Sequence, residues 1–327
     1  MNEIHAVQQQ GLEQDRLNRI MPSEYDAQML KLRLPEQDAL KNDAERCSAD
    51  PVMLNSIGRA VGHQVRINRK GDPGFTALYT VKQANPPADL TDPSRANVVR
   101  TGQLGRERLG TSAEMKVVVH ATVVDTAPQP CEPIGVRFFE VAEDDGKQAY
   151  LIAIAPHGGE IEKHTDEEAA CLKEELVSKG YPASAWICKG YGDEVKGASG
   201  RWHITSTDLH PASFPLLQAL INRKFRYGVA FHGFAKQCGE ADVYIGGGAA
   251  EYLKKEIKNA LEALSLPIKV KIATAYDDPK FQGYSSDNII NRLAEQGIHI
   301  EQSPEARAHS KDIAKAIAMV YRRSRRK

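Results

Sequence analysis

The chain has 327 residues, and its 43 Lys and Arg balance its 43 Asp and Glu. This balance provides neither a positive field for nucleic acid nor the acidic excess of a disordered chain, and the length fits one or two domains. There is no secretory signal and no apolar stretch long enough to cross a bilayer, and the five cysteines lack CxxC spacing. We therefore expect a cytoplasmic protein with reduced thiols that has neither nucleic acid nor membrane as a partner.

Residues 1–50 are polar and rich in Gln, Glu, Asp and Lys, so we expect a helical or poorly ordered extension. From 51 to 130 the chain contains short stretches in which apolar and polar residues alternate, as they do in half-buried strands. The expected strands cover 64–68, 75–81, 96–100 and 115–124. The pattern predicts a small β-rich N-terminal module, which is a candidate to bind an unidentified partner.

Residues 134–327 alternate strand-like and helix-like stretches. The capping-box spacing of Thr165 and Glu168 predicts a helix over 166–179, and Ser303 followed by Pro304 predicts the start of the last helix. Further helices are expected over 211–219, 249–264 and 286–295, and strands over 150–155, 185–188, 227–231, 242–245, 268–273 and 298–301. Such alternation is typical of an α/β domain with a mixed, mainly parallel sheet flanked by helices.

The most informative run is PHGGEIE at 156–162, which directly follows the apolar stretch 150–155. Its two glycines permit a tight turn, so that His157 and a carboxylate could converge at the end of a strand. Catalytic zinc takes such a mixed nitrogen and oxygen set and leaves its fourth position to water. His232 also directly follows an apolar run and is a candidate third ligand. In open α/β sheets the site lies beyond the carboxyl ends of the strands, where His157, His232 and Glu301 are expected.

Several short motifs then occur in a fixed order: PHGGEIE at 156–162, HITST at 203–207, FHGF at 231–234, NR at 291–292 and IE at 300–301. Together they resemble the poly-γ-glutamate hydrolases, a family known from phages that has a zinc carboxypeptidase-like fold. The resemblance covers about 140–320 and does not extend to the first 130 residues. It implies a Zn²⁺ ion held by His157, Glu162 and His232, with Glu301 as the catalytic carboxylate. Glu160 stands where the family has glycine, and its His-x-x-Glu spacing leaves it open as an alternative ligand.

The resemblance also implies metal-assisted hydrolysis of an amide bond. Glu301 would take a proton from the metal-activated water and pass it to the leaving amine. Arg292 is our first choice to stabilise the oxyanion or a substrate carboxylate. Further candidates for substrate binding are Arg201, Arg307, His203, Thr205 and Ser206.

Two other histidines, His210 and His299, have alternative interpretations. His210 is an alternative ligand, although its position directly before Pro211 favours a structural role. His299 alternates with Ile298 and Ile300, which indicates that it shares a face of the strand with Glu301. The favoured interpretation of His299 is a half-buried histidine whose polar atoms are satisfied within the fold.

The sequence therefore predicts a zinc-dependent hydrolase of γ-glutamyl bonds that acts on a glutamyl polymer or peptide. One alternative is a zinc aminoacylase or carboxypeptidase that acts on small N-acyl or peptide substrates. Another is a non-catalytic binding protein on the same fold.

Overall fold

The computed structural model describes residues 22–324 except 35, 92–96, 147 and 236–239. The chain divides into two compact units, Met1–Val123 and Val124–Lys327. Three parts of our expectations lie outside the described residues: residues 1–21 of the expected extension, Ala96 of an expected strand, and Cys238, one of the five cysteines. Among the helices of the described residues, none combines the length and the hydropathy that a membrane span requires.

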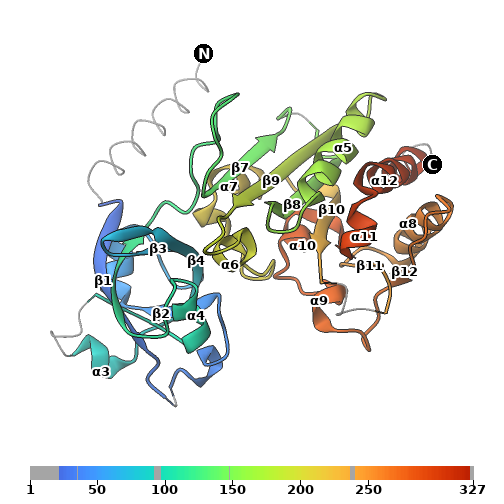
Figure 1. Ribbon diagram of the computed structural model, residues 1–327. Helices are drawn as coiled ribbons and strands as arrows, with labels where there is room; N and C mark the ends of the chain where they lie inside the picture. Colours follow the sequence, from blue (N-terminus) through green and yellow to red (C-terminus); the bar gives the residue numbers. More distant parts are fainter. Residues whose placement is uncertain (1–21, 35, 92–96, 147, 236–239, 325–327) are drawn as a thin grey trace. The chain divides into compact units, whose positions relative to one another are not determined.

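The first unit is a closed β-barrel (Figure 1). Its strands pair around the barrel in the order β1 (Glu24–Lys31), β5 (Val98–Thr101), β2 (Arg46–Ala49), β4 (Asp72–Ala84), β3 (Gln64–Arg69) and β6 (Met115–His120). The connections contain η1 (Asp38–Leu40), α2 (Pro51–Ser56), α3 (Pro87–Leu90) and α4 (Gln103–Glu107). Apolar side chains such as Met29, Val65 and Val119 form its core. Closure leaves the barrel without an unpaired sheet edge.

The barrel corrects our expectation for residues 1–50. Residues 24–31 and 46–49 are β1 and β2, and they are neither helical nor loosely held. Ala27 and Met29 are the fully buried positions of β1, so the apolar signal of this strand is weak. The strand is stabilised instead by pairing with β5 and β6, which come much later in the chain.

The second unit is built on a seven-stranded sheet. Its order is β12 (Val270–Ile272), β11 (Val243–Gly246), β13 (Ala294–Gln302), β10 (Phe225–Gly233), β8 (Leu151–Gly159), β9 (Ala183–Tyr191) and β7 (Arg137–Glu143). The central strands β13, β10, β8 and β9 are parallel, whereas β11 and β7 flank them in antiparallel pairs and β12 runs parallel to β11. The predicted mixed α/β fold is confirmed.

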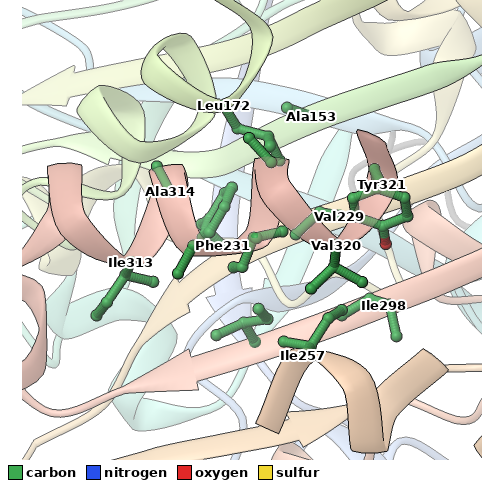
Figure 2. Close-up of a cluster of buried hydrophobic side chains, with 14 of the residues drawn as sticks. Ala153, Leu172, Val229, Phe231, Ile257, Ile298, Ile313, Ala314, Val320 and Tyr321 are labelled. Carbon is green, nitrogen blue, oxygen red and sulfur yellow. The ribbon is translucent and has the colours of Figure 1, made fainter. Parts of the chain in front are cut away.

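Helices cover both faces of this sheet. One face carries α5 (Thr165–Val177), α8 (Glu251–Glu262) and α12 (Ser310–Ser324). The other face carries α6 (Ala198–Trp202), η3 (Pro211–Ser213), α7 (Pro215–Leu220), α9 (Pro279–Gln282) and α10 (Ile289–Leu293). The short helix α11 (Pro304–Arg307) directly precedes α12. Figure 2 shows the core of the first face, where α12 lies between α5 and α8 over the central strands. Ala153, Val229 and Ile298 point into this core. The side chains that alternate with Val229 and Ile298 therefore face the α9 and α10 side.

Two helix boundaries differ from the expected ones. The N-cap of α5 is His164, and Glu168 does not form a capping box, because its side chain accepts a hydrogen bond from Gln302. The helix expected over 286–295 ends at Leu293, since β13 begins at the next residue. The predicted cap is confirmed, with the Ser303 hydroxyl accepting a hydrogen bond from the backbone N–H of Ala306, but it begins the short α11, and the last helix, α12, begins separately at Ser310.

Candidate metal centre

His157, His232 and Glu301 lie near the carboxyl ends of β8, β10 and β13, which are parallel neighbours in the sheet. His232 and Glu301 are register partners on adjacent strands, so their side chains leave the same face. These three residues and Glu162 line a cleft of about 640 Å³. Other residues that line it are His203, Thr205, Ser206, Thr207, Phe234, Lys280, Tyr284, Asn288 and His299.

An irregularity in β8 directs His157 into this cleft. Ala153 and Ala155 belong to the core on the α5 side, and strict alternation would send His157 to that same side. However, the pairing of β8 with β9 shifts between Ala155 and Gly158, so that β8 contains one residue more than its partner over this stretch. Such a β-bulge re-aims a side chain. As a result the ring of His157 lies 5.0 Å from that of His232, measured between centroids.

Three side-chain donors meet at this bulge. Nδ1 of His157 lies 3.1 Å from Oε1 of Glu162 and 3.2 Å from Nδ1 of His232. Nδ1 of His232 lies 3.7 Å from Oε2 of Glu162. Donors around a tetrahedral zinc ion with bonds of about 2.1 Å are themselves about 3.4 Å apart. The three separations therefore fit ligands of a single divalent ion.

The outer nitrogens of both rings have partners of their own. Nε2 of His157 lies 2.9 Å from the carbonyl oxygen of Ile204, which can only accept, so the ring donates from Nε2. Nε2 of His232 lies 3.3 Å from the hydroxyl of Ser206. Both rings thus direct Nδ1 toward Glu162. Metal-binding histidines are held in the same way, with the outer nitrogen bonded to the protein.

The carboxylate of Glu162 is buried, and its Oε2 has no hydrogen-bond partner among the described residues. Burial alone would raise the pKa of Glu162, but the adjacent rings of His157 and His232 outweigh it and hold that pKa well below its ordinary value. Burial, followed by the neighbouring His299, lowers the pKa of His232 to about 4. Near neutral pH the site presents a carboxylate and a neutral His232 imidazole, the protonation states in which these groups bind metals.

His203 is a second candidate for the third donor. Its Nε2 lies 3.7 Å from Oε1 of Glu162, and its ring centroid lies 4.2 Å from that of His157. The donor atoms of His157, Glu162 and His203 all lie within 4.8 Å of one another. In the set that contains His232, the separations are 3.1, 3.2 and 3.7 Å, with His157 facing Oε1 and His232 facing Oε2 of Glu162. We therefore keep His232 in the candidate donor triad, and His203, which also lines the cleft, is the alternative third donor.

The structure separates the alternative ligands from this triad. Glu160 is exposed, and its Oε2 accepts a hydrogen bond from the backbone N–H of Gly192. Glu162, rather than Glu160, is therefore the carboxylate beside the histidines. His210 caps η3, where its Nδ1 accepts a hydrogen bond from the backbone N–H of Ala212 at 3.2 Å.

Of the three arginines proposed for the substrate, none is among the described residues that line the cleft. Arg201 is fully buried and forms an ion pair with Asp193 at 2.8 Å, so our expectation of a substrate-binding role is wrong for this residue. Arg292 donates a hydrogen bond to the carbonyl of Leu209. Arg307 donates to the carbonyl of Lys163, and it packs so closely on Gly233 that any side chain at 233 would collide with its guanidinium.

Sequence reasoning missed one wall of the cleft, which the segment around α9 supplies through Lys280 and Tyr284. A signal for this helix was present. Asp278 is its N-cap and accepts a hydrogen bond from the backbone N–H of Lys280, while Pro279 occupies the first helical position. The expected cleft residues His203, Thr205 and Ser206 do line the cleft.

Comparisons with known proteins give one family model and several similar solved structures. The family model described as poly-gamma-glutamate hydrolase matches residues 136–319. Among solved structures, a bacteriophage poly-gamma-glutamate hydrolase is similar at 22% identity, covering 60% of this chain and 93% of its own, with a TM-score of 0.47. The zinc-free form of YNDL is similar at 20% identity (57% and 90% covered, TM-score 0.44), and a metallo-carboxypeptidase from Burkholderia cenocepacia at 10% (64% and 72%, TM-score 0.38). No curated protein matches the chain.

Proposed function

The chain belongs to the poly-gamma-glutamate hydrolase family, and from this premise we propose that it is a zinc-dependent hydrolase of γ-linked glutamyl amide bonds. One observation carries the proposal. Nδ1 of His157, the carboxylate of Glu162 and Nδ1 of His232 converge within 3.1–3.7 Å, in a cleft that Glu301 also lines.

Zinc is the metal that suits this donor set. Two imidazoles and one carboxylate are a common protein contribution to catalytic zinc, and they leave one position open. In the protein alone, one proton between the two Nδ1 atoms cannot satisfy both rings and Glu162 together, whereas a cation at their centre can. When bound, zinc polarises the scissile carbonyl and makes a water molecule acidic near neutral pH.

Glu301 is the proposed general base. It stands directly opposite His232 on the neighbouring strand, so its carboxylate is carried to the same end of the cleft. It takes a proton from the attacking water as the new carbon–oxygen bond forms. It then returns that proton to the amine nitrogen as the carbon–nitrogen bond breaks.

The cleft wall is the proposed site of substrate recognition. Thr205, Ser206 and Thr207 offer hydroxyl groups for the amide and carboxylate groups of a glutamyl unit. Lys280 offers a positive charge, although it also forms an ion pair with Asp278 at 3.1 Å. Arg307 does not line the cleft, but it lies against Gly233, which does, so it is the arginine that we propose nearest to the substrate.

Hydrolysis of defined glutamyl substrates tests this function. The zinc-loaded protein should cleave γ-linked glutamyl oligomers and leave α-linked oligomers of the same length intact. Loss of activity on chelation and its return with zinc should accompany cleavage. Zinc-loaded protein that leaves γ-linked oligomers uncut would contradict the proposal.

A smaller substrate is the second candidate. Among the described residues that line the cleft, Lys280 is the one lysine, and there is no arginine. A single positive side chain suits a substrate with one carboxylate better than a long polyanion. The lengths of the products separate the two. Internal cleavage of a polymer gives oligomers from the first turnovers, whereas a carboxypeptidase or aminoacylase releases single units.

A further inference from the structure

His299 lies beside the proposed general base and is almost completely buried, with 3% of its surface exposed. It precedes Glu301 by two residues in β13, so both side chains leave the same face of the strand. Nε2 of His299 lies 3.1 Å from Oε1 of Glu301 and 3.2 Å from the carbonyl oxygen of Lys280. The histidine is thus in direct contact with the carboxylate that the reaction requires.

The partners of His299 define which nitrogen donates. The Lys280 carbonyl can only accept, and so can an ionised Glu301 carboxylate, so the proton of a neutral ring belongs on Nε2. On the other side, Nδ1 lies 3.5 Å from Nδ2 of Asn288. The Oδ1 of Asn288 caps α10 by accepting from the backbone N–H of Ile290, which turns its amide N–H₂ toward the ring. Asn288, His299 and Glu301 therefore form a chain of donors that ends on the carboxylate.

Packing fixes the orientation of the ring. On one side its centroid lies 4.5 Å from that of His232. On the other side, Gly283 has a φ of +58°, and a Cβ at this position would come within 2.5 Å of the His299 side chain. A glycine is therefore required there for the segment that follows α9 to close over the imidazole. The ring has little freedom to turn away from Glu301.

We propose that His299 is a positioning residue that holds the Glu301 carboxylate in place for proton transfer. This inference rests on the proposed function, in which Glu301 is the base. A hydrogen bond to Oε1 occupies that oxygen and restricts rotation about the side-chain bonds of Glu301, so that Oε2 is the oxygen that exchanges the proton. Displacement of a catalytic group by about 1 Å can lower the rate on the order of 10²-fold.

The test compares His299→Leu, which removes the N–H donor, with His299→Gln, whose amide can donate in its place. We expect His299→Leu to lower kcat by about 10- to 100-fold while KM changes less than about threefold. His299→Gln should recover most of that loss. Zinc content and affinity, measured by chelator competition, should stay near the parent values in both. His120→Leu, the same exchange in the barrel, serves as the control for handling and folding.

A double-mutant cycle separates this inference from the proposed function. In a Glu301→Gln background, His299→Leu should lower the residual rate by less than about twofold, because the carboxylate that it positions is absent. Equal losses in both backgrounds, or equal rates for His299→Leu and His299→Gln, would overturn the positioning role. Full activity of Glu301→Gln alone would instead remove Glu301 as the base.

Discussion

The barrel and the hydrolase unit both bury polar side chains, but the two units use them differently. In the barrel, Nη2 of Arg100 lies 3.0 Å from Oδ1 of Asp89, and its Nε contacts the other oxygen of that carboxylate. Asn85 bonds to the hydroxyl of Ser48 and to the carbonyl of Val98. At the cleft, by contrast, the buried Oε2 of Glu162 has no hydrogen bond within the described residues, and its neighbour Nδ1 of His232 lies 3.7 Å away.

The difference separates structural from functional burial. A buried polar group that is paired costs little, whereas an unpaired one destabilises the fold by about 1–3 kcal/mol. The Arg100–Asp89 pair is therefore accounted for by the fold alone. The oxygen of Glu162 that lacks a hydrogen bond faces two imidazole nitrogens, and the proposed cation would satisfy all three atoms.

The largest effect is expected for Glu162→Gln. The amide has no charge to offer a cation, so zinc affinity should fall on the order of 10³-fold or more, beyond the 10- to 100-fold typical of residues outside the ligand set. The zinc-free protein should be less stable than the parent near pH 7, because the lowered pKa of Glu162 means that the folded state favours the ionised carboxylate, and glutamine loses that contribution. Chelator competition and urea unfolding measure the two effects.

His232→Ala and His203→Ala provide the comparison for that experiment. The first should lose zinc as Glu162→Gln does, and the second should retain affinity within about tenfold. A larger loss of zinc affinity in His203→Ala than in His232→Ala would show that His203, and not His232, is the third ligand.

The next effect is expected for Glu301→Gln, which keeps the shape of the side chain and removes the base. The value of kcat should fall about 10³-fold, within the range typical of general base catalysis. Zinc affinity should change only a few-fold, since Glu301 is outside the donor triad. Steady-state kinetics on a γ-linked oligomer measure kcat, and zinc analysis measures the bound metal. Loss of zinc together with the loss of kcat would indicate that Glu301 is a metal ligand and not the base.

Asp89→Ala should destabilise the barrel by about 3 kcal/mol, because it leaves the Arg100 guanidinium buried without its carboxylate. Both tryptophans of the chain, Trp186 and Trp202, belong to the hydrolase unit. The unfolding transition seen by far-ultraviolet circular dichroism should therefore shift while the one seen by tryptophan fluorescence stays in place. Asp26→Ala, which breaks the exposed ion pair with Lys70, should cost less than about 1 kcal/mol.

A smaller effect than that of Asp89→Ala is expected for Glu168→Gln, and it depends on pH. Burial raises the pKa of Glu168 well above its ordinary value, so the folded state binds this proton more tightly than the unfolded chain does. The associated stability is present below the unfolded pKa and is lost as pH rises through the folded one. Glutamine stays neutral throughout. The variant should match the parent near pH 4 and exceed it at pH 8 by about 1 kcal/mol, measured by urea unfolding with tryptophan fluorescence. A difference independent of pH would contradict this assignment.

The sequence was sufficient to predict the strand ends that carry His232 and Glu301, because an apolar run followed by a polar residue is a local signal. The start of α11 was equally local, since Ser303 and Pro304 are adjacent. The features that were missed depend on distant partners. Glu168 has capping-box spacing but bonds to Gln302, and Arg201 pairs with Asp193 instead of facing a substrate.

His299 shows the same limit within the site. Alternation along β13 correctly indicated that it shares a face with Glu301, but not what surrounds it. Its environment is set by Lys280, Gly283 and Asn288, whose approach depends on how α9 and α10 fold back over the sheet. A single histidine in a sequence therefore does not distinguish a structural residue from one that serves a neighbour.

The extra residue between Ala155 and Gly158 has a practical consequence for protein engineering. A designer who grafts this triad onto another parallel sheet, copying His157 and Glu162 but keeping an unbroken strand, would deliver the imidazole to the wrong layer. Insertion of one residue at the graft point is the change that would restore it, so the transferable unit is the interrupted strand and not the pair of ligands.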